Sequence, residues 1–546
     1  MPLPIVTQMT SEADLLEPLR RYWGYDSFRP MQERVVRSLL AGRDTCVIMA
    51  TGGGKSLCYQ LPASLAMEKT AIVISPLIAL MQDQTAQLAQ IGIEAAVLNS
   101  SLAPRETESI MRNAVDGRYR LLYLSPERLA RQDTLDWLRQ VPVSFFVIDE
   151  AHCISEWGHE FRPEYRQLSS LRVQFPDRPI AAFTASATRQ VRHDIIEQLQ
   201  LRDPDKYIAS FHRPNLKYIV KKCDSKTQFP LLVSAIRAHP DGAIIVYAPT
   251  IANLAEMIAK LEEHGIEATG YHGKMDALTR KRNQELWMSG EVRVIVGTVA
   301  FGLGINKPDV RAVIHLSLPK SIEQYYQEAG RGGRDGLPAD CLLLWRPRDA
   351  GLHAYFIGAI TDSAEKERAW QRYHTIRDFV ECGLCRHFQI CRHFGESTKW
   401  KSCGACDVCS DDPNWFLLSA QKQTAKRSEP GKHSEQQPRA PQLIPQTQNE
   451  TPEFAELRAY LREWRRAMAR SQDIPAFIVM HDTSLDDLCK KHPSSLTEIR
   501  EVSGFGARKT ELYGQQILDA LQRFHEGARD PSVSSFESSA GDRNLK

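Results

Sequence analysis

Short apolar runs alternate with helical patterns from about residue 44 to residue 345. The runs lie at residues 70–74, 120–124, 145–148, 180–183, 243–247, 292–296 and 312–316. All but residues 120–124 contain β-branched residues, and each run has the length of a buried strand. Because strands that alternate with helices usually form a parallel sheet covered by helices, the pattern predicts an α/β fold with two consecutive lobes.

The pattern changes after the second series of runs. Residues 350–412 are helical and then cysteine-rich, whereas 420–450 are rich in Gln, Pro, Lys and Ser and poor in apolar residues, which predicts disorder. Helical periodicity returns over 453–526. We therefore predict a first lobe (1–208), a second lobe (209–346), a helical cysteine-rich module (347–412), a disordered linker (413–451), a helical bundle (452–527) and a disordered tail (528–546).

The composition is that of a globular protein. The 546 residues are 42% hydrophobic and 25% charged, and no apolar run is long enough to span a membrane. The acidic N-terminus does not resemble a signal peptide, so we expect an intracellular protein without a membrane partner. Since the net charge is only +2, any surface for nucleic acid must be a local basic channel.

A glycine-rich turn connects an apolar run to a helical pattern at residues 50–56. Its three glycines allow main-chain N–H groups to surround phosphate oxygens, and the following helix adds its positive dipole end. Lys55 would reach the β- and γ-phosphates, and the hydroxyl of Ser56 would hold Mg²⁺. Met49 stands where the strict motif has glycine, so an ordinary glycine loop is the alternative. The residues predicted to bind nucleotide here are Thr51, Gly52, Gly53, Gly54, Lys55 and Ser56.

An acid pair follows the apolar run at 145–148. A strand would deliver Asp149 to Mg²⁺ at the carboxyl edge of the sheet, and Glu150 would polarise the attacking water. The alternative is a strand that happens to end in acids. Trp157, Phe161 and Arg162 come soon after, in a polar stretch, and could stack on bases. Core packing of the two aromatic rings is the other interpretation.

Two arginines lie three residues apart in a glycine-rich segment of the second lobe. If residues 324–336 face the first lobe, Arg331 and Arg334 would reach the γ-phosphate from across the interface. Such residues stabilise charge in the transition state and make hydrolysis depend on lobe closure. A solvated basic turn is the alternative.

Six of the 12 cysteines lie between Cys382 and Cys409. In a reducing compartment this crowding favours metal over disulfides. Four thiolates form a closed tetrahedral Zn²⁺ site with a structural role, and the predicted ligands are Cys385, Cys403, Cys406 and Cys409. The fourth ligand stays open, because spare candidates lie nearby at Cys382, His387, Cys391 and His393. A redox role is disfavoured, since no thioredoxin-like βαβ pattern surrounds the CxxC pairs.

The order of the motifs resembles the RecQ family of superfamily-2 DNA helicases over about residues 15–410. The motifs are TGGGKS, SPLIALMQDQ, DEAHCISEWGHEFRPEY, FTASAT, TVAFGLGINKPDVR and YYQEAGRGGRDG. The resemblance implies two tandem RecA-like lobes, a helical zinc-binding module and an all-α HRDC bundle. It also implies ATP, Mg²⁺ and Zn²⁺ as cofactors and favours Arg334 as the arginine finger.

The resemblance assigns further roles by position. Tyr25, Arg29 and Gln32 correspond to residues that recognise adenine, although Met31 stands where the family usually has glycine. The aromatic loop that couples DNA binding to hydrolysis corresponds to Trp157, His159, Phe161 and Arg162. Thr298 belongs to a segment that joins nucleotide to the DNA backbone. Residues 246–250 lack the usual serine–arginine pair, so a phosphate contact is expected to be missing.

The C-terminal part resembles the family's HRDC domain. A Gly-x-Gly turn at 504–506 opens a helix, and Lys509 would hold a DNA phosphate there. A protein-contact bundle is the alternative, because acidic and basic residues nearly balance over this module. Only about 40 residues separate Cys409 from the bundle, so no winged-helix domain fits between them.

The motifs and the resemblance together predict an ATP-dependent DNA helicase of repair and recombination that binds single-stranded, forked or tailed DNA. Its 3′–5′ polarity is implied by the resemblance alone. A single-strand-binding protein and a topoisomerase are the partners we consider. Two alternatives remain: a translocase or annealing factor that unwinds weakly, and a DNA-binding scaffold with an inactive ATPase. The compartment would be the cytoplasm, at the nucleoid, in a prokaryote and the nucleus in a eukaryote.

Overall fold

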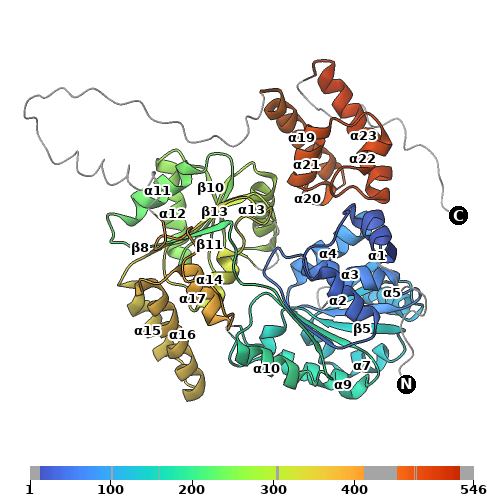
Figure 1. The fold of residues 1–546 in the computed structure, drawn as a ribbon, viewed down its shortest axis with the longest axis horizontal. Coiled ribbons are helices and arrows are strands. Elements are labelled where there is room, and N and C mark those ends of the chain that lie inside the picture. Colours follow the sequence, from blue (N-terminus) through green and yellow to red (C-terminus); the bar gives the residue numbers. More distant parts are fainter. Residues whose placement is uncertain are drawn as a thin grey trace, which may run out of the picture.

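The computed structural model describes residues 13–99, 102–158, 160–302, 307–410, 452–472, 474 and 476–528. Two α/β lobes, a helical module and a C-terminal bundle follow one another along the chain (Figure 1). The predicted linker and tail, and His159 of the aromatic loop, lie outside the described residues. Among the described helices, none has both the length and the apolar character needed to span a membrane.

The first lobe is a fully parallel seven-stranded sheet with the order β3-β4-β2-β5-β6-β1-β7. Its strands are β1 (Thr45–Ile48), β2 (Thr70–Ile74), β3 (Ala95–Leu98), β4 (Leu121–Leu124), β5 (Val143–Ile148), β6 (Ile180–Thr184) and β7 (Asp205–Ile208). Side chains alternate between two apolar clusters, with Ile72 and Ile74 on one face of β2 and Ala71 and Val73 on the other. Burial on both faces explains why the strands read as continuous apolar runs.

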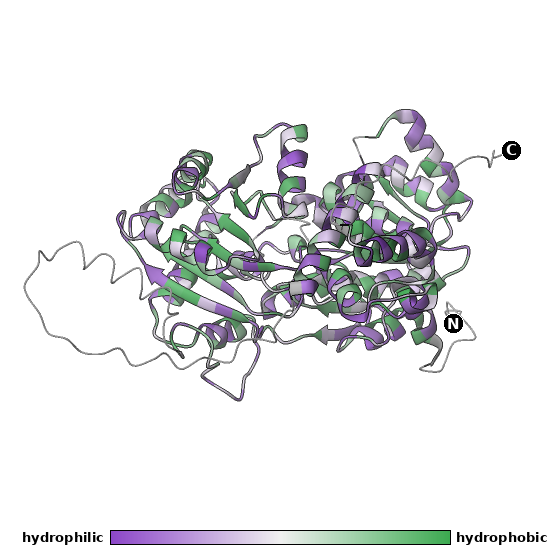
Figure 2. Ribbon diagram, turned by 90° about the horizontal axis from the view of Figure 1, so that it is seen from above, coloured by the Kyte–Doolittle hydropathy of each residue, from purple (hydrophilic) through white to green (hydrophobic). Residues whose placement is uncertain are grey.

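Helices cover both faces of this sheet. The α-helices are α1 (Ala13–Pro18), α2 (Gln32–Leu40), α3 (Lys55–Leu65), α4 (Ile78–Gln90), α5 (Pro104–Val115), α6 (Pro126–Leu129), α7 (Gln132–Leu138), α8 (Pro163–Arg166), α9 (Ser170–Gln174) and α10 (Arg189–Gln198). A π-helical turn, η1 (Leu19–Trp23), and the 3₁₀ turns η2 (Ala151–Ile154) and η3 (Gln167–Ser169) complete the lobe. Figure 2 shows the apolar strands inside and the mixed polarity of the helices around them.

The second lobe is a parallel six-stranded sheet with the order β10-β11-β9-β12-β13-β8. Its strands are β8 (Leu216–Lys222), β9 (Ala243–Tyr247), β10 (Ala268–Tyr271), β11 (Val294–Gly297), β12 (Val310–His315) and β13 (Ala339–Trp345), and its helices are α11 (Gln228–Ala238), α12 (Ile251–Glu263), α13 (Ala277–Ser289) and α14 (Ile322–Ala329). Two parallel sheets in tandem confirm the predicted α/β fold.

The helical module contains α15 (Asp349–Gly358), α16 (Ser363–Glu381) and α17 (Arg386–His393), and α16 and α17 pack against α14 of the second lobe. The C-terminal bundle contains α19 (Pro452–Ser471), α20 (Ala476–Val479), α21 (Asp482–Lys491), α22 (Leu496–Arg500) and α23 (Ala507–His525) around its own apolar core.

The bundle touches both lobes, because α20 contacts α4 of the first and α13 of the second (Figure 1). Arg466 donates to the Ser289 carbonyl at 2.7 Å, and the Tyr513 hydroxyl donates to Gln90 at 2.6 Å. The turn at 504–506 packs closely on the first lobe, since a Cβ added at Gly506 would lie 2.5 Å from the carbonyl oxygen of Arg21.

Candidate active site between the lobes

The phosphate loop follows β1 and leads directly into α3. Gly52 and Gly54 have φ angles of +81° and +82°, which favour glycine, and α3 begins at Lys55. The loop carbonyls bind protein side chains: Arg29 donates to Gly52 at 2.5 Å and Gln32 donates to Gly54 at 3.1 Å. The Lys55 ammonium donates to the carbonyl of Met49 at 3.2 Å.

Two of the residues predicted to recognise adenine, Arg29 and Gln32, therefore already bond carbonyls of the phosphate loop. Gln32 is 3% exposed, and its Oε1 accepts the Arg29 amide at 2.8 Å. Tyr25 is 40% exposed and its ring can meet a base. Met31 has a φ of +72°, so the position favours glycine and the departure from the family adds strain rather than removing a contact. Adenine recognition by these residues stays a prediction.

The acid pair lies where β5 ends. Asp149 is 7% exposed; burial and the neighbouring Glu150 raise its pKa to about 7, while Lys55 acts in the opposite direction. A buried and a half-buried carboxylate beside a hydroxyl-bearing loop are a donor set that suits Mg²⁺, and Asp149 and Ser56 would hold it. Glu150 has a left-handed φ of +47°, a strained conformation that is typical of functional sites.

Arg334 of the second lobe lies against the phosphate loop of the first. A Cβ added at Gly52 would be 3.2 Å from Arg334 Cγ. Burial and the charges of Arg331 and Arg213 lower the pKa of Arg334 to about 9. Arg331 is 7% exposed and its guanidinium packs on Gly302. Gathered cations of this kind form a site for an anion such as a triphosphate.

A polar path links the acid pair to the second lobe. His152 Nδ1 lies 3.3 Å from a carboxylate oxygen of Glu150 and 2.9 Å from the Thr184 hydroxyl. Two residues further on, the Ser186 hydroxyl accepts a hydrogen bond from Gln327 of α14 at 2.8 Å. Sequence reasoning missed Gln327, since only the meeting of the lobes reveals its partner.

The aromatic loop is partly exposed. Trp157 is 49% exposed, and the guanidinium of Arg368 from α16 lies 6.0 Å from the centre of its ring. Phe161 and Arg162 are half-buried, and Arg166 stacks over Phe161 at 5.5 Å. The exposed ring of Trp157 fits the stacking hypothesis, which stays a prediction.

Thr298 and Lys509, the remaining residues predicted to bind DNA, are largely buried. Thr298 is 9% exposed and its amide donates to the carbonyl of Tyr271 at 3.2 Å. Lys509 is 8% exposed and its ammonium donates to the carbonyls of Ile478 and Val479 at 3.0 and 3.3 Å. In this position Lys509 holds α23 to α20 and does not present its charge to a phosphate.

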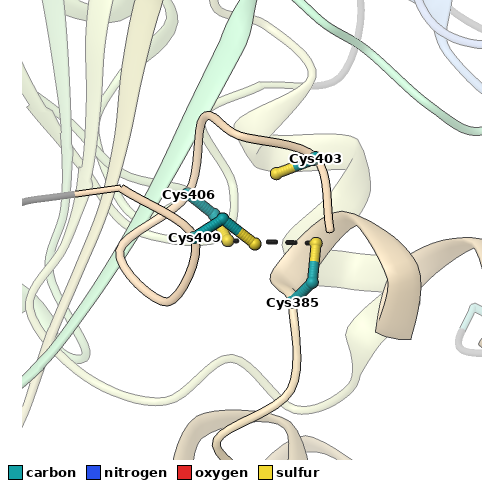
Figure 3. A group of neighbouring side chains, drawn as sticks. All are labelled: Cys385, Cys403, Cys406 and Cys409. Atoms are coloured by element: carbon teal, nitrogen blue, oxygen red, sulfur yellow. Dashed lines mark hydrogen bonds between the residues drawn. The ribbon is translucent and has the colours of Figure 1, made fainter. Parts of the chain in front are cut away.

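The cysteine cluster has the geometry of a metal site (Figure 3). The sulfur atoms of Cys385, Cys403, Cys406 and Cys409 all lie within 4.8 Å of one another. Zinc–sulfur bonds of about 2.3 Å require separations of about 3.8 Å, so the cluster fits Zn²⁺. Although burial opposes it, hydrogen bonds from Ser402 and the Cys403 amide lower the pKa of the Cys409 thiol to about 6.

The spare candidate ligands have other positions. Cys382 is outside the cluster, and burial raises the pKa of Cys391 to about 12. His387 Nε2 bonds the carbonyl of Arg213 at 3.1 Å, and His393 Nε2 lies 2.6 Å from a carboxylate oxygen of Glu323. Of the candidates for the fourth ligand, Cys385 is therefore the one whose sulfur lies with those of Cys403, Cys406 and Cys409.

Lobes that meet over one phosphate loop, with an arginine of the second lobe packed on it, are characteristic of motor ATPases whose hydrolysis depends on lobe closure. Family models match in the same order: DEAD/DEAH box helicase over 29–194, helicase conserved C-terminal domain over 227–336, RecQ zinc-binding over 347–410 and HRDC domain over 454–521.

Curated relatives cover nearly the whole chain. The ATP-dependent DNA helicase RecQ of Pasteurella multocida is 34% identical, with 93% of each chain covered. That of Haemophilus influenzae is 33% identical over 95% of this chain and 97% of its own length. The chain belongs to the RecQ family of ATP-dependent DNA helicases. Its cofactors are ATP, Mg²⁺ and Zn²⁺.

Solved structures share the fold of the lobes. Yeast Dbp5 bound to RNA and ADP BeF3 aligns with a TM-score of 0.50 at 17% identity, over 66% of this chain and 96% of that one. The DUF1998 helicase MrfA bound to DNA also gives 0.50 at 17% identity, over 63% of this chain and 53% of that one. At this identity the likeness concerns the fold alone.

Proposed function

We propose that this protein couples ATP hydrolysis to 3′–5′ movement along single-stranded DNA and thereby separates duplexes in DNA repair and recombination. The observation that supports the proposal best is the packing of Arg334 on the phosphate loop. It brings an arginine of the second lobe to the loop of the first lobe that would hold the nucleotide. Membership of the RecQ family supplies the substrate and the polarity.

Each residue of the site has a role in this proposal. The loop amides and Lys55 hold the phosphates, and Ser56 and Asp149 hold Mg²⁺, which when bound offsets phosphate charge. Glu150 orients the attacking water, and Arg334 and Arg331 stabilise the charge that develops on the γ-phosphate. Closure of the lobes brings these groups together, and release of the products lets the lobes separate.

DNA would reach this chemistry through the aromatic loop. Trp157, His159, Phe161 and Arg162 follow the acid pair directly in sequence, so stacking of a base on the loop can shift Glu150 and His152. Single-stranded, forked or tailed DNA is the proposed ligand. A single-strand-binding protein and a topoisomerase are proposed partners, and the proposed compartment is the one that holds the chromosome.

ATPase and fork-unwinding assays of the wild type and of Lys55→Ala test the proposal. We expect DNA to stimulate hydrolysis and the fork to be separated by the wild type alone. Hydrolysis without strand separation would leave a translocase or annealing factor. Hydrolysis no faster than in Lys55→Ala would leave a DNA-binding scaffold. Forks with a single 3′ or 5′ tail determine the polarity.

A further inference from the structure

The connection between the lobes, residues 209–215, contains an arginine that binds both of them. Nη1 of Arg213 donates to the carbonyl of Thr51 in the phosphate loop at 3.1 Å. Nη2 donates to the carbonyls of Gly332 and Gly333, each at 3.3 Å. These glycines lie between Arg331 and Arg334, so one guanidinium joins the loop that holds phosphate to the turn that presents the arginines.

The planar guanidinium suits this position. Its nitrogens point in fixed directions, which allows one side chain to bond carbonyls of two different lobes. Within the described ranges no carboxylate pairs with Arg213, and Asn215 supports the same turn by donating to Gly333 at 2.8 Å. With Arg29 and Gln32 on the next carbonyls, Arg213 fixes the first residue of the loop from outside the first lobe.

The zinc module fixes the main chain on both sides of this arginine. The Phe211 ring stacks on Phe394 with centroids 4.3 Å apart and planes 11° apart. The Glu396 carboxylate accepts the Ser210 hydroxyl at 2.7 Å and the Phe211 amide at 2.8 Å. His387 bonds the Arg213 carbonyl at 3.1 Å. The module therefore fixes the point from which Arg213 reaches the loop.

We propose that Arg213 is a positioning residue, held by the zinc module, that couples the conformation of the phosphate loop to the arginine turn as the lobes close. The inference rests on the proposed ATPase function. It assigns no contact with the reacting atoms to Arg213. Loss of the bridge should leave the nucleotide site able to bind ATP but slow to bring Arg334 into position.

Steady-state ATPase assays with saturating single-stranded DNA test this coupling. Arg213→Gln should lower kcat at least about tenfold, because misplacement of catalytic groups by an ångström can cost about 100-fold in rate. It should raise KM for ATP by a smaller factor, because the bond to Thr51 is one of several that order the loop. Arg213→Lys keeps the charge but cannot bridge both lobes, so it should recover less than a third of the lost rate. Arg237→Gln is the matched control, since Arg237 donates to the His264 carbonyl within one lobe.

A double-mutant cycle with Glu396→Ala tests the part played by the zinc module. Glu396→Ala should lower kcat in the wild-type background and have no further effect beside Arg213→Gln. Equal effects in both backgrounds would overturn the role of the module. Thermal melts and zinc content show whether each variant folds. If Arg213→Gln does not fold, the kcat of Arg213→Lys becomes the test of the coupling.

Other outcomes separate the two proposals. Absence of DNA-stimulated hydrolysis in the wild type would refute the proposed function itself. An active wild type with kcat of Arg213→Gln within twofold would refute the coupling alone. A raised KM at unchanged kcat would make Arg213 a binding residue, and full recovery by Arg213→Lys would show that charge suffices without the bridge.

Discussion

The substitution Gln32→Ala tests whether Gln32 orders the phosphate loop or recognises adenine. The side chain accepts the Arg29 amide at 2.8 Å and donates to the Gly54 carbonyl at 3.1 Å, with a longer contact of 3.5 Å to Gly53. A neutral hydrogen bond contributes about 0.5–1.5 kcal/mol. The bond to Gly54 is the short one that reaches the loop and should stabilise its ordered form by about 0.5–1.5 kcal/mol, whereas the bond to the Arg29 amide orients the Gln32 side chain.

A loss of this size raises the Kd of any ligand that needs the ordered loop by about 2- to 13-fold. Inorganic tripolyphosphate needs the loop but has no base. Gln32→Ala should therefore weaken ATP and tripolyphosphate by the same factor, as measured by displacement of a fluorescent ATP analogue in the presence of Mg²⁺. Tyr25→Leu should weaken ATP alone, because its exposed ring can stack on the base but does not touch the loop carbonyls.

The opposite result would refute this reasoning. If Gln32→Ala raised the Kd of ATP tenfold and left tripolyphosphate unchanged, Gln32 would read the base and its bonds to the loop would contribute little. Gln132→Ala is the matched control, since Gln132 is exposed and bonds Asp136 on the same helix. It should change neither Kd.

Three further predictions concern other parts of the molecule. Because burial raises the pKa of Asp149 to about 7, ionisation of this carboxyl lowers the free energy of unfolding of the nucleotide-free protein as pH rises from about 4 to 7. Calorimetry should therefore show that Asp149→Asn raises the free energy of unfolding by about 2 kcal/mol more at pH 8 than at pH 5.5. Cys409→Ser should lose zinc and about 10 kcal/mol of binding free energy, whereas Cys382→Ser should keep the metal, as elemental analysis would show. Lys509→Met should leave the salt dependence of single-stranded DNA binding unchanged in fluorescence anisotropy, and a slope smaller by about 0.7 would mean that its ammonium does reach a phosphate.

Local motifs predicted much of the fold and the nucleotide site. The apolar runs are strands because both faces of each sheet are covered, and the phosphate loop follows its strand because glycines supply the left-handed turns. Sequence spacing also grouped the cysteines, but it could not exclude His387 and His393 as ligands. Their bonds to Arg213 and Glu323 come from elements far away in the chain.

Arg213 shows why the remaining contacts were missed. It lies 162 residues from Thr51 and 119 from Gly332, so no local pattern joins them. Lys509 shows the converse case, in which a local pattern and the structure differ. A cation after a glycine turn is typical of phosphate binding, but the turn of the helix carries this ammonium into the bundle.

Among the described residues, two side-chain hydrogen bonds between the lobes provide a route by which DNA would control hydrolysis without touching the nucleotide. Arg213 joins the carbonyl side of the phosphate loop to the arginine turn, and Gln327 joins Ser186 to the helix that precedes this turn. The bond of Arg213 depends on the conformation of the phosphate loop. The bond of Gln327 depends on the segment 184–186, in which Thr184 bonds His152. Because both lead to the segment that carries Arg334, its position would depend on the phosphate loop and on the segment behind the aromatic loop together. Hydrolysis should therefore become fast only when nucleotide and DNA act on this segment together.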